Sequence, residues 1–504
     1  PVMEGKGMLF KIYAGIDVFD IEVDSSNVDE FVETVKRIAP TFGGINLEDI
    51  KAPECFEIER RLKEELDIPL MHDDQHGTAI ISAAALINAA ELAGKKLEEL
   101  KLVINGAGAS AISCAQLYIS VGVKKENILM LDSKGVISIH RDNLNEQKQM
   151  FAADTDLTTL EEAMKGADVF VGLSMGNIVS QDMVRSMADN PIVFALANPD
   201  PEISYNEAMA AREDIIMATG RSDHPNQVNN VLGFPYIFRG ALDVRATKIN
   251  EEMKLAATYA LANLAKQPVP DSVNKAYSSK NLTFGRDYII PKPTDPRLIY
   301  TISPAVAKAA IESGVAKGRI DNEIGYTQTL MALLGNDNAL IRALTIRAKE
   351  DPKRVVFAEA ENYKILKAAQ ALLEDDVAKP ILLGVPESIK ELADEFTVDL
   401  EGIQIINPRE GEGLEMGKKF ADAYFLKRQR KGVTPLDAIH DMRSRNHFGA
   451  MMVDQGYADA MVSGITKNYA VPIKPALQII GMQEGVQKAA GMYMVSTKKG
   501  TFFF

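Results

Sequence analysis

The sequence predicts an α/β protein built around a doubly wound parallel sheet. A smaller α/β domain precedes this sheet, and a partial α/β domain follows it. Apolar runs rich in Val, Ile and Leu alternate with helix-like segments between residues 78 and 240, as expected for parallel strands joined by crossover helices. A Pro-rich stretch at 289–297 and a seam at 314–352 then lead into another α/β pattern. We therefore expect three domains, at residues 1–77, 78–315 and 325–504.

Residues 1–77 mix strand and helix patterns. IDVFDIEVD (16–24) alternates apolar and polar residues and predicts a half-buried strand. VDEFVETVKRIA (28–39) and FEIERRLKEEL (56–66) have the period of amphipathic helices. Two short apolar runs lie within FGGINLEDI and IPLMHDD, and each ends in a pair of acidic residues.

The central segment contains five strand candidates that are apolar on both faces: KLVIN, NILMLD, DVFVGLS, IVFALAN and IIMATG. Each of them ends in small or polar residues: GAGAS after the first, then Asp132, Ser174, Asn198 and Gly220. Ligands bind at the carboxyl ends of the strands in an open parallel sheet. These endings therefore predict one ligand-binding rim.

The last part of the chain begins with a predicted helix, SPAVAKAAIESGVAKG (303–318). The third α/β pattern follows in RVVFAEAE, PILLGVPESIKEL, IQIINP and ADAMVSGI. Both ends of the chain look cut, since Pro1 stands where an initiator Met is expected and KKGTFFF ends on an apolar run. We expect a fragment of a longer polypeptide.

Composition excludes several classes of protein. The formal net charge of −14 over 504 residues argues against nucleic acid as a partner, because phosphate contacts need a basic face. No apolar run approaches the about 18 residues of a membrane span. Cys55 and Cys114 have no CxxC partner, which fits a reducing compartment, the cytoplasm, and disfavours a thiolate zinc site.

The segment KLVINGAGASAISCAQL has the form strand, GxGxxA, helix, which is typical of a Rossmann-type dinucleotide site. Gly106 allows the tight turn, Gly108 lets a pyrophosphate approach the backbone, and Ala111 allows close helix packing. The helix N-terminus offers free N–H groups to phosphate. The alternative is a glycine-rich turn without a ligand.

The strand after this loop leaves the choice of dinucleotide open. Asp132 could accept a hydrogen bond from a ribose 2′-hydroxyl, which favours NAD. Ser133, Lys134 and nearby Arg141 could instead accept a 2′-phosphate, which favours NADP.

Two acidic pairs, Glu48–Asp49 and Asp73–Asp74, end strand-like runs. Several converging carboxylates suit a hard divalent cation, Mg²⁺ or Mn²⁺, with open positions for substrate oxygens. The alternative is that these acids cap helices or face solvent. Zinc bound by His72 and His76 is a less favoured interpretation.

Long motifs resemble malic enzymes: EGKGMLFKIYAGID, FGGINLEDIKAPECFEIE, HDDQHGTAII, NGAGASAI, LDSKG, ALANPDPEI and TGRSDHPNQVNNVLGFPYIFRGALD. They resemble most closely the bacterial multidomain type, NADP-dependent as a rule, in which a phosphotransacetylase-like domain follows. The malic part covers about residues 1–310. From about 325 the chain resembles the first half of a phosphotransacetylase domain, as in KRVVFAEAE, HFGAMMVDQGYADAMVSGI and KPALQIIG.

The resemblance implies metal-dependent oxidative decarboxylation of malate to pyruvate and CO₂, with roles for matching residues. Lys6 matches the general base, and Asp73 matches the acid that supports the lysine or the metal. The matching metal ligands are Glu48, Asp49 and Asp74. The pyrophosphate loop is matched by Ala107, Gly108, Ala109 and Ser110, and the nicotinamide and malate contacts by Asn198 and Asn230.

The chain also departs from the family pattern. The family's tyrosine acid and one malate-binding arginine lie upstream of the part that matches Pro1, and its phosphotransacetylase-like domain continues past Phe504. Lys467, Asn468 and Tyr469 stand where small hydroxyl residues are usual. The resemblance therefore implies a regulatory domain that responds to acetyl-CoA and drives homo-oligomerisation, rather than an acetyltransferase.

Two alternatives remain open beside the malic enzyme interpretation. One is a dinucleotide-dependent 2-hydroxy acid dehydrogenase that does not decarboxylate and needs no metal. The other is a non-catalytic regulatory or assembly fragment that binds nucleotide or acetyl-CoA.

Overall fold

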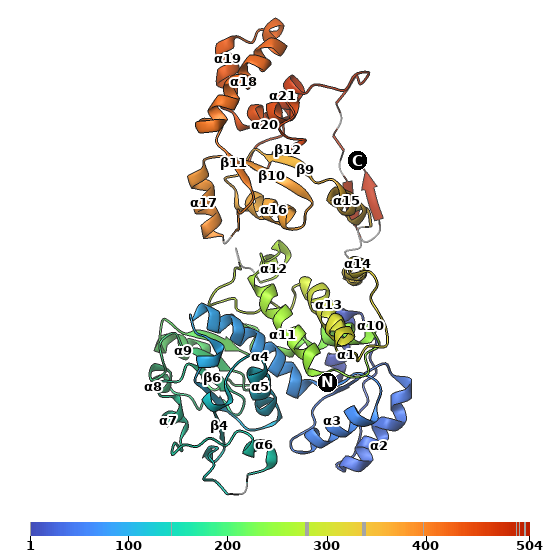
Figure 1. Ribbon diagram of the computed structural model, residues 1–504, viewed down its shortest axis with the longest axis vertical. Helices are drawn as coiled ribbons and strands as arrows, with labels where there is room; N and C mark the ends of the chain where they lie inside the picture. The colour runs from blue at the N-terminus through green and yellow to red at the C-terminus, as the bar shows by residue number, and fades with distance from the viewer. Residues whose placement is uncertain are drawn as a thin grey trace. The chain divides into compact units, whose positions relative to one another are not determined.

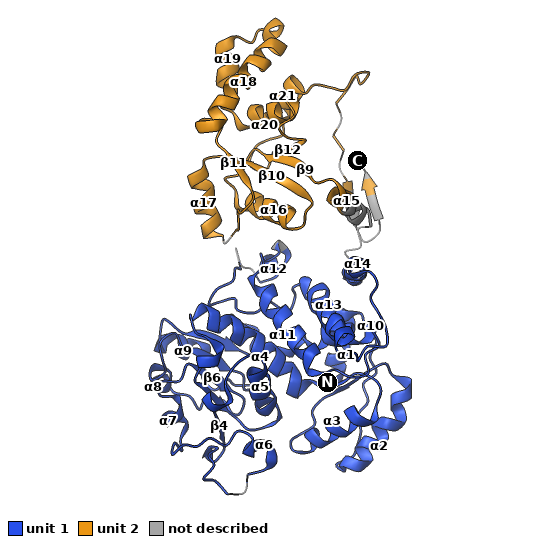
Figure 2. Cartoon of the chain, in the orientation of Figure 1, with its two compact units in different colours: residues 1–336 blue, residues 337–504 orange. Residues whose placement is uncertain are grey.

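The structure is a computed structural model that describes residues 2–142, 144–277, 282–334, 339–396, 398–489, 491–492, 494–497 and 500–503. The chain forms two compact units, residues 1–336 and 337–504 (Figure 1, Figure 2). The finer boundaries that the sequence suggested stay predictions. Within the described ranges, none of the helices combines the length and apolar character that a membrane crossing needs.

The first unit opens with three helices and a small sheet. Two strands, β1 (Ile45–Leu47) and β2 (Leu70–His72), run parallel, and Leu47 pairs with His72. The predicted amphipathic helices are confirmed, because their apolar faces pack on this sheet. The three helices are α1 (Val2–Ala14), α2 (Val28–Ile38) and α3 (Glu54–Glu65).

The predicted strand at 16–24 is wrong. This stretch is irregular, and no described strand pairs with it. Its apolar side chains stay largely outside the core, and Phe19 is 73% exposed. Alternation produces a strand only where a neighbouring edge accepts the backbone hydrogen bonds, and β1 and β2 pair with each other instead.

A six-stranded sheet forms the centre of the first unit, in the order β5-β4-β3-β6-β7-β8. Five strands are parallel, and β5 runs antiparallel to β4. All five predicted strands are confirmed. The strands are β3 (Leu102–Asn105), β4 (Ile128–Asp132), β5 (Gly135–Val136), β6 (Val169–Gly172), β7 (Ile192–Ala195) and β8 (Ile216–Thr219).

Helices cover both faces of this sheet (Figure 1). Alternate residues of each strand enter two separate apolar clusters, as a doubly wound sheet requires. One face packs on α4 (Asp73–Leu92), α5 (Ala109–Ser120) and α11 (Glu251–Lys266). The other packs on α7 (Leu160–Met164), α8 (Gln181–Arg185) and α9 (Tyr205–Ala211).

The remaining helices of this unit include α13 (Arg297–Glu312), which starts earlier and ends earlier than the predicted helix 303–318. It stops because Gly314 adopts a positive φ of 74° soon afterwards. Leu330 of the later helix α14 is buried in the same core, and Tyr326 Oη donates to Asp243 Oδ2 at 2.7 Å. The others are α6 (Glu146–Gln149), α10 (Phe234–Asp243), α12 (Asp271–Ala276) and α14 (Glu323–Leu333).

The second unit contains a four-stranded parallel sheet in the order β11-β10-β9-β12. The predicted third α/β pattern is thus confirmed, and the unit has its own apolar clusters. Its strands are β9 (Lys353–Phe357), β10 (Ala378–Leu383), β11 (Gln404–Ile406), β12 (Ala460–Val462) and an antiparallel pair, β13 (Met494–Thr497) and β14 (Gly500–Phe503). Its helices are α15 (Ala339–Glu350), α16 (Tyr363–Glu374), α17 (Pro386–Glu395), α18 (Gly411–Arg428), α19 (Pro435–Asp441), α20 (Arg445–Asp454) and α21 (Ala470–Ile479).

Candidate active site

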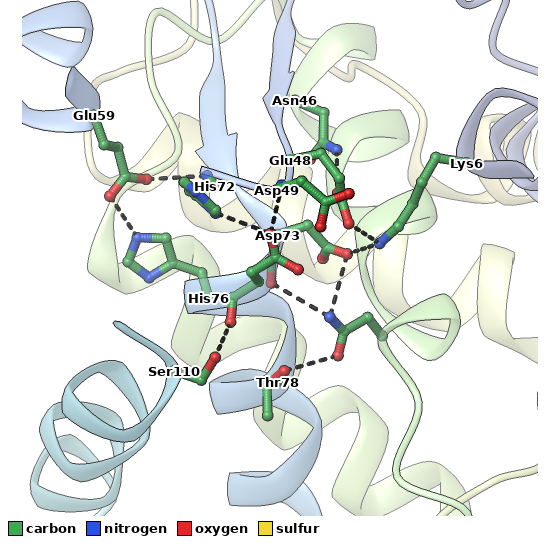
Figure 3. Close-up of polar contacts among 12 residues, drawn as sticks. Lys6, Asn46, Glu48, Asp49, Glu59, His72, Asp73, His76, Thr78 and Ser110 are labelled. Atoms are coloured by element: carbon green, nitrogen blue, oxygen red, sulfur yellow. Dashed lines mark hydrogen bonds and ion pairs between the residues drawn. The ribbon is translucent and has the colours of Figure 1, made fainter. Parts of the chain in front are cut away.

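The two acidic pairs meet because β1 and β2 are parallel neighbours. Glu48 follows β1 directly, and Asp73 follows β2, so the register of Leu47 with His72 sets the two carboxylates side by side (Figure 3). Asp73 and Asp74 also open helix α4, where the positive end of the helix dipole favours negative charge.

Lys6 reaches this pair from helix α1 (Figure 3). Its Nζ lies 3.1 Å from Glu48 Oε1 and forms an ion pair with Asp73 Oδ2. Burial by itself lowers the pKa of Lys6, but the charges of Asp73 and Glu48 outweigh it and raise the pKa above its ordinary value. The ammonium also lies 4.4 Å from the ring centroid of Phe234, a cation–π contact that no sequence pattern marked.

The two carboxyls around Lys6 carry more negative charge than one lysine offsets. Burial, followed by the charge of Asp73, raises the pKa of Glu48 to about 7. Burial also raises the pKa of Asp73, whose side chain is fully buried. Asp73 Oδ1 has no hydrogen-bond partner among the described residues, and it lies where a Cβ on Gly77 would overlap it.

The other two acids are more open. Asp49 is exposed and adopts a positive φ of 56°. Its backbone N–H donates to Asp74 Oδ2 at 2.8 Å, which ties the two acidic pairs together. Asp74 is 39% exposed at its side chain and lines a cavity of about 440 Å³.

This cavity, which we call the substrate cavity, also brings Lys6, Asn198 and Asn230 together. Asn230 Nδ2 lies 3.3 Å from Asp73 Oδ2, and its Oδ1 accepts a hydrogen bond from Thr78 Oγ1 at 3.1 Å. The remaining lining residues are Thr78, Ser110, Leu173, Ser174, Leu196, Ala197, Gly220, Val228 and Asn229.

The glycine-rich loop lies in a second cavity of about 700 Å³, the dinucleotide cavity. Gly106 has a φ of 134°, and a Cβ there would lie 2.6 Å from the carbonyl oxygen of Leu173, so only glycine fits. A Cβ on Gly108 would meet open space, which leaves this backbone open to a ligand. Leu173 and Ser174 line both cavities.

The predicted loop residues divide between the cavities. Gly106, Ala107, Gly108, Asp132 and Ser133 line the dinucleotide cavity. Ala109 and Ala111 lie in the first turn of α5, where Ala111 is buried, and Lys134 is not in the lining.

Ser110, predicted in the pyrophosphate loop, lies in the first turn of α5. It lines the substrate cavity, and its Oγ donates to the backbone oxygen of Asp74 at 2.6 Å (Figure 3). The loop is therefore bonded directly to the acidic site.

Asp132 is engaged by two cationic side chains. Arg141 donates to both carboxylate oxygens, at 3.0 and 2.9 Å, and Lys148 Nζ lies 2.7 Å from Oδ2. Burial acts to raise the pKa of Asp132, but hydrogen bonds from Arg141 and Lys148 outweigh it and lower the pKa. Lys148 also lines the dinucleotide cavity, although no local motif indicated it.

The chemistry of the acidic donors fits a hard cation. The raised pKa of Glu48 and the unpartnered Asp73 Oδ1 both indicate that these carboxylates would stabilise an added positive charge. Within the described part of the chain, however, no three His, Cys, Asp or Glu side chains come close enough to hold one ion. His76 fits zinc poorly, since its Nε2 lies 2.9 Å from Glu59 Oε2 and its Nδ1 lies 3.3 Å from Lys254 Nζ.

A glycine-rich loop at the switch point of a doubly wound sheet, beside a lysine–carboxylate pocket, defines a dinucleotide-binding α/β protein. Family models agree in detail. The malic enzyme N-terminal domain matches residues 1–63, the malic enzyme NAD binding domain matches 75–276, and phosphate acetyl/butaryl transferase matches 339–504. The chain belongs to the malic enzyme family.

Individual relatives support the same assignment. The chain is 51% identical to an NADP-dependent malic enzyme of Rhizobium meliloti, over 96% of this chain and 64% of the relative. An NAD-dependent malic enzyme of the same organism is 46% identical over the whole chain and 66% of its own length. The chain thus spans just under two thirds of the length of both relatives.

A further relative and a solved structure each match about two thirds of this chain. An NADP-dependent malic enzyme of Halomonas elongata is 60% identical over 63% of this chain and 75% of its own length. The crystal structure of malic enzyme from Pyrococcus horikoshii has a TM-score of 0.61 and 38% identity, covering 68% of this chain and 78% of that chain.

Proposed function

We propose that this chain is the catalytic part of a malic enzyme that oxidatively decarboxylates (S)-malate to pyruvate and CO₂ and reduces NADP⁺. The observation that carries the proposal is the placement of Lys6. Its amine lies between Glu48 and Asp73 on the wall of the substrate cavity, which shares Leu173 and Ser174 with the dinucleotide cavity. A base and a hydride acceptor can therefore act on the same small substrate.

Lys6 would serve as the general base. Because its pKa is raised, the amine must first give up a proton, and its neighbour Asp73, whose own pKa is raised, is placed to accept it. Neutral Lys6 then takes the proton of the malate hydroxyl as hydride leaves C2 for the nicotinamide. The resulting 2-oxo acid loses its C4 carboxylate as CO₂, and protonation at C3 gives pyruvate.

Glu48, Asp49 and Asp74 would bind Mg²⁺ or Mn²⁺. Such an ion supplies Lewis-acid polarisation of the substrate oxygens. Asn198 and Asn230 would orient malate and the nicotinamide amide, because both line the substrate cavity and a side-chain amide can donate and accept.

The cofactor we infer is NADP rather than NAD. Both oxygens of Asp132 already accept hydrogen bonds from Arg141, and one of them also faces Lys148, so little acceptor capacity remains for ribose hydroxyls. Lys148 and Ser133, which line the dinucleotide cavity, offer a 2′-phosphate a positive charge and hydrogen-bond donors.

The test is malate-dependent reduction of NADP⁺ and, in parallel, NAD⁺, with and without Mn²⁺, together with release of CO₂. Metal-dependent reduction with CO₂ release supports the proposal. Reduction that yields oxaloacetate without CO₂ and without metal supports the simple dehydrogenase instead. Ligand binding without any turnover, in this chain and in the full-length protein, supports the regulatory alternative.

Lys6→Met should lower kcat by about 10²- to 10⁴-fold, the usual contribution of a general base. Lys11→Met is the matched control, because Lys11 lies on the same helix and is 62% exposed. Unchanged turnover in Lys6→Met would rule out this role.

We further propose that the second unit is an effector domain for acetyl-CoA. A cavity of about 410 Å³ in this unit is lined by four cationic side chains, which suits a ligand rich in phosphate; they are Arg409, Arg443, Arg445 and Lys467. Calorimetric titration with acetyl-CoA should show saturable binding that Arg443→Ala weakens. No binding, or acetyl transfer to phosphate, would contradict this role.

Two further assignments are proposals as well. Residence in the cytoplasm is supported by two free, buried cysteines, Cys55 and Cys114. Assembly into homo-oligomers stays a prediction, with sedimentation analysis as its direct measurement.

A further inference from the structure

A buried carboxylate outside the substrate cavity calls for a function. Glu59 lies on α3, is only 6% exposed and is absent from the lining of the substrate cavity. Burying a carboxylate is costly unless several donors satisfy it. The burial of Glu59 therefore indicates that its negative charge has a specific structural or functional role.

The two oxygens of Glu59 contact residues on either side of the aspartate pair (Figure 3). Oε1 accepts a hydrogen bond from the backbone N–H of His72 at 3.1 Å and lies 2.9 Å from Lys63 Nζ. Oε2 lies 2.9 Å from His76 Nε2. Asp73 and Asp74 lie between His72 and His76 in the sequence, so one side chain fixes both ends of this segment.

The contacts continue away from the substrate cavity. His76 Nδ1 lies 3.3 Å from Nζ of Lys254, which is 5% exposed and belongs to α11. Lys254 in turn forms an ion pair with Glu251. An ammonium only donates and a carboxylate only accepts, so the His76 tautomer with hydrogen on Nε2 satisfies both neighbours.

We propose that Glu59, supported by His76 and Lys254, is a positioning residue that sets the first turn of α4 and thereby aims Asp73 at Lys6 and Asp74 into the substrate cavity. This inference rests on the proposed function, since it takes the role of that turn to be the placement of the cation and of the base Lys6. None of the three residues lines the substrate cavity, so each acts through the backbone or side chain of the next.

The experiment measures Mn²⁺ affinity of the whole 504-residue chain from the electron paramagnetic resonance signal of free Mn²⁺. His76→Leu removes the ring contact and should weaken Mn²⁺ binding by about 10- to 100-fold, as loss of supporting contacts around a metal typically does. His76→Gln should restore most of the affinity, because its amide can donate to Glu59 and accept from Lys254.

Glu59→Gln provides an isosteric second variant if His76→Leu does not fold. A single amide cannot accept from both His72 N–H and His76 N–H, so its Mn²⁺ affinity should also fall. Glu57→Gln is the matched control on the same helix, since Glu57 is exposed and pairs only with neighbouring Arg60 in the described contacts. It should bind Mn²⁺ as the parent does.

The possible outcomes distinguish failure of the positioning role from failure of the proposed metal site. Folded His76→Leu and Glu59→Gln variants that bind Mn²⁺ like the parent overturn the positioning role, even if their thermal midpoints fall, because a purely structural role changes only stability. Equal loss in His76→Leu and His76→Gln also contradicts it. A parent chain without a saturable Mn²⁺ site overturns the proposed metal site and this inference with it.

Discussion

Glu48 makes the stability of the metal-free protein depend on pH. Its folded-state pKa of about 7 lies above the ordinary 4.5, so the folded protein retains a proton that the unfolded chain releases between those values. The contribution of Glu48 to the free energy of unfolding is therefore fully present below pH 4.5 and is lost as the pH rises through 7.

Glu48→Gln removes this dependence, because glutamine does not ionise. Relative to the parent in EDTA, the variant should gain unfolding free energy from pH 4.5 to pH 7.5, at no more than about 1.4 kcal/mol per pH unit. Urea unfolding at several pH values measures the difference. A constant difference would contradict the raised pKa, and Mn²⁺ should cancel the advantage of the variant at pH 7.5.

Gly77 is required by the carboxylate of Asp73. A Cβ at this position would overlap Asp73 Oδ1 and lie 3.0 Å from Asn230 Cγ. Gly77→Ala should therefore displace Asp73 from Lys6 and lower kcat by about 10-fold or more, since small misplacements at an active site are costly.

Gly94→Ala is the control for this glycine substitution, because a Cβ there meets nothing within 4 Å, although its φ of 69° carries backbone strain. Loss of stability without loss of kcat is expected for the control. An unchanged kcat in Gly77→Ala would show that Asp73 can move freely.

At the residue scale, the sequence predicted the site only where a motif or a family pattern marked it. The acidic pairs stood out because like charges ended two apolar runs, and Lys6 was indicated only by resemblance. The sequence assigned no role to Glu59, Lys148 or Phe234, because each meets its partner only once the chain has folded.

We expect the segment from β4 to α6 to set the proposed preference for NADP over NAD. Lys148→Ala removes one of the two cations on Asp132 and should raise KM for NADP⁺ by about 10-fold, the equivalent of one charged hydrogen bond. KM for NAD⁺ should change much less, because NAD⁺ has no 2′-phosphate.

Lys124→Ala is the control, since Lys124 is exposed and precedes the same strand. Binding of 2′,5′-ADP and of 5′-AMP, measured by calorimetry, separates the 2′-phosphate contact from turnover. An equal loss of affinity for both nucleotides would mean that Lys148 stabilises the fold of the loop and does not bind the 2′-phosphate.

Helices and strands could be predicted from the sequence where buried residues recur at the regular spacing of a helix or a strand. The five parallel strands are apolar on both faces because helices cover both faces, and the amphipathic helices follow the same logic. The strand predicted at 16–24 was wrong because alternation of apolar and polar residues does not show whether a neighbouring strand is available for pairing.

The whole molecule should divide into parts that fold separately, because each buried apolar cluster formed by the described residues lies within one unit. A chain ending at residue 334 should unfold cooperatively and bind Mn²⁺ and nucleotide as the parent does, measured by circular dichroism and calorimetry. Aggregation of this piece, or loss of both ligands, would contradict the independence of the first unit.

A piece that ends at residue 318 tests the role of α14 in that unit. It lacks Leu330, which is 1% exposed, and the hydrogen bond from Tyr326 to Asp243. We expect lower stability than for the piece ending at 334, by about 2–5 kcal/mol, the usual result of emptying one large apolar site.

The bond from the Ser110 hydroxyl to the Asp74 carbonyl has a thermodynamic consequence. It joins the first turn of α5, beside the glycine-rich loop, to the first turn of α4, so a shift of either turn has a free-energy cost in the other. We therefore expect the proposed nucleotide and the proposed cation to be linked ligands, with the same factor by which each changes the affinity of the other.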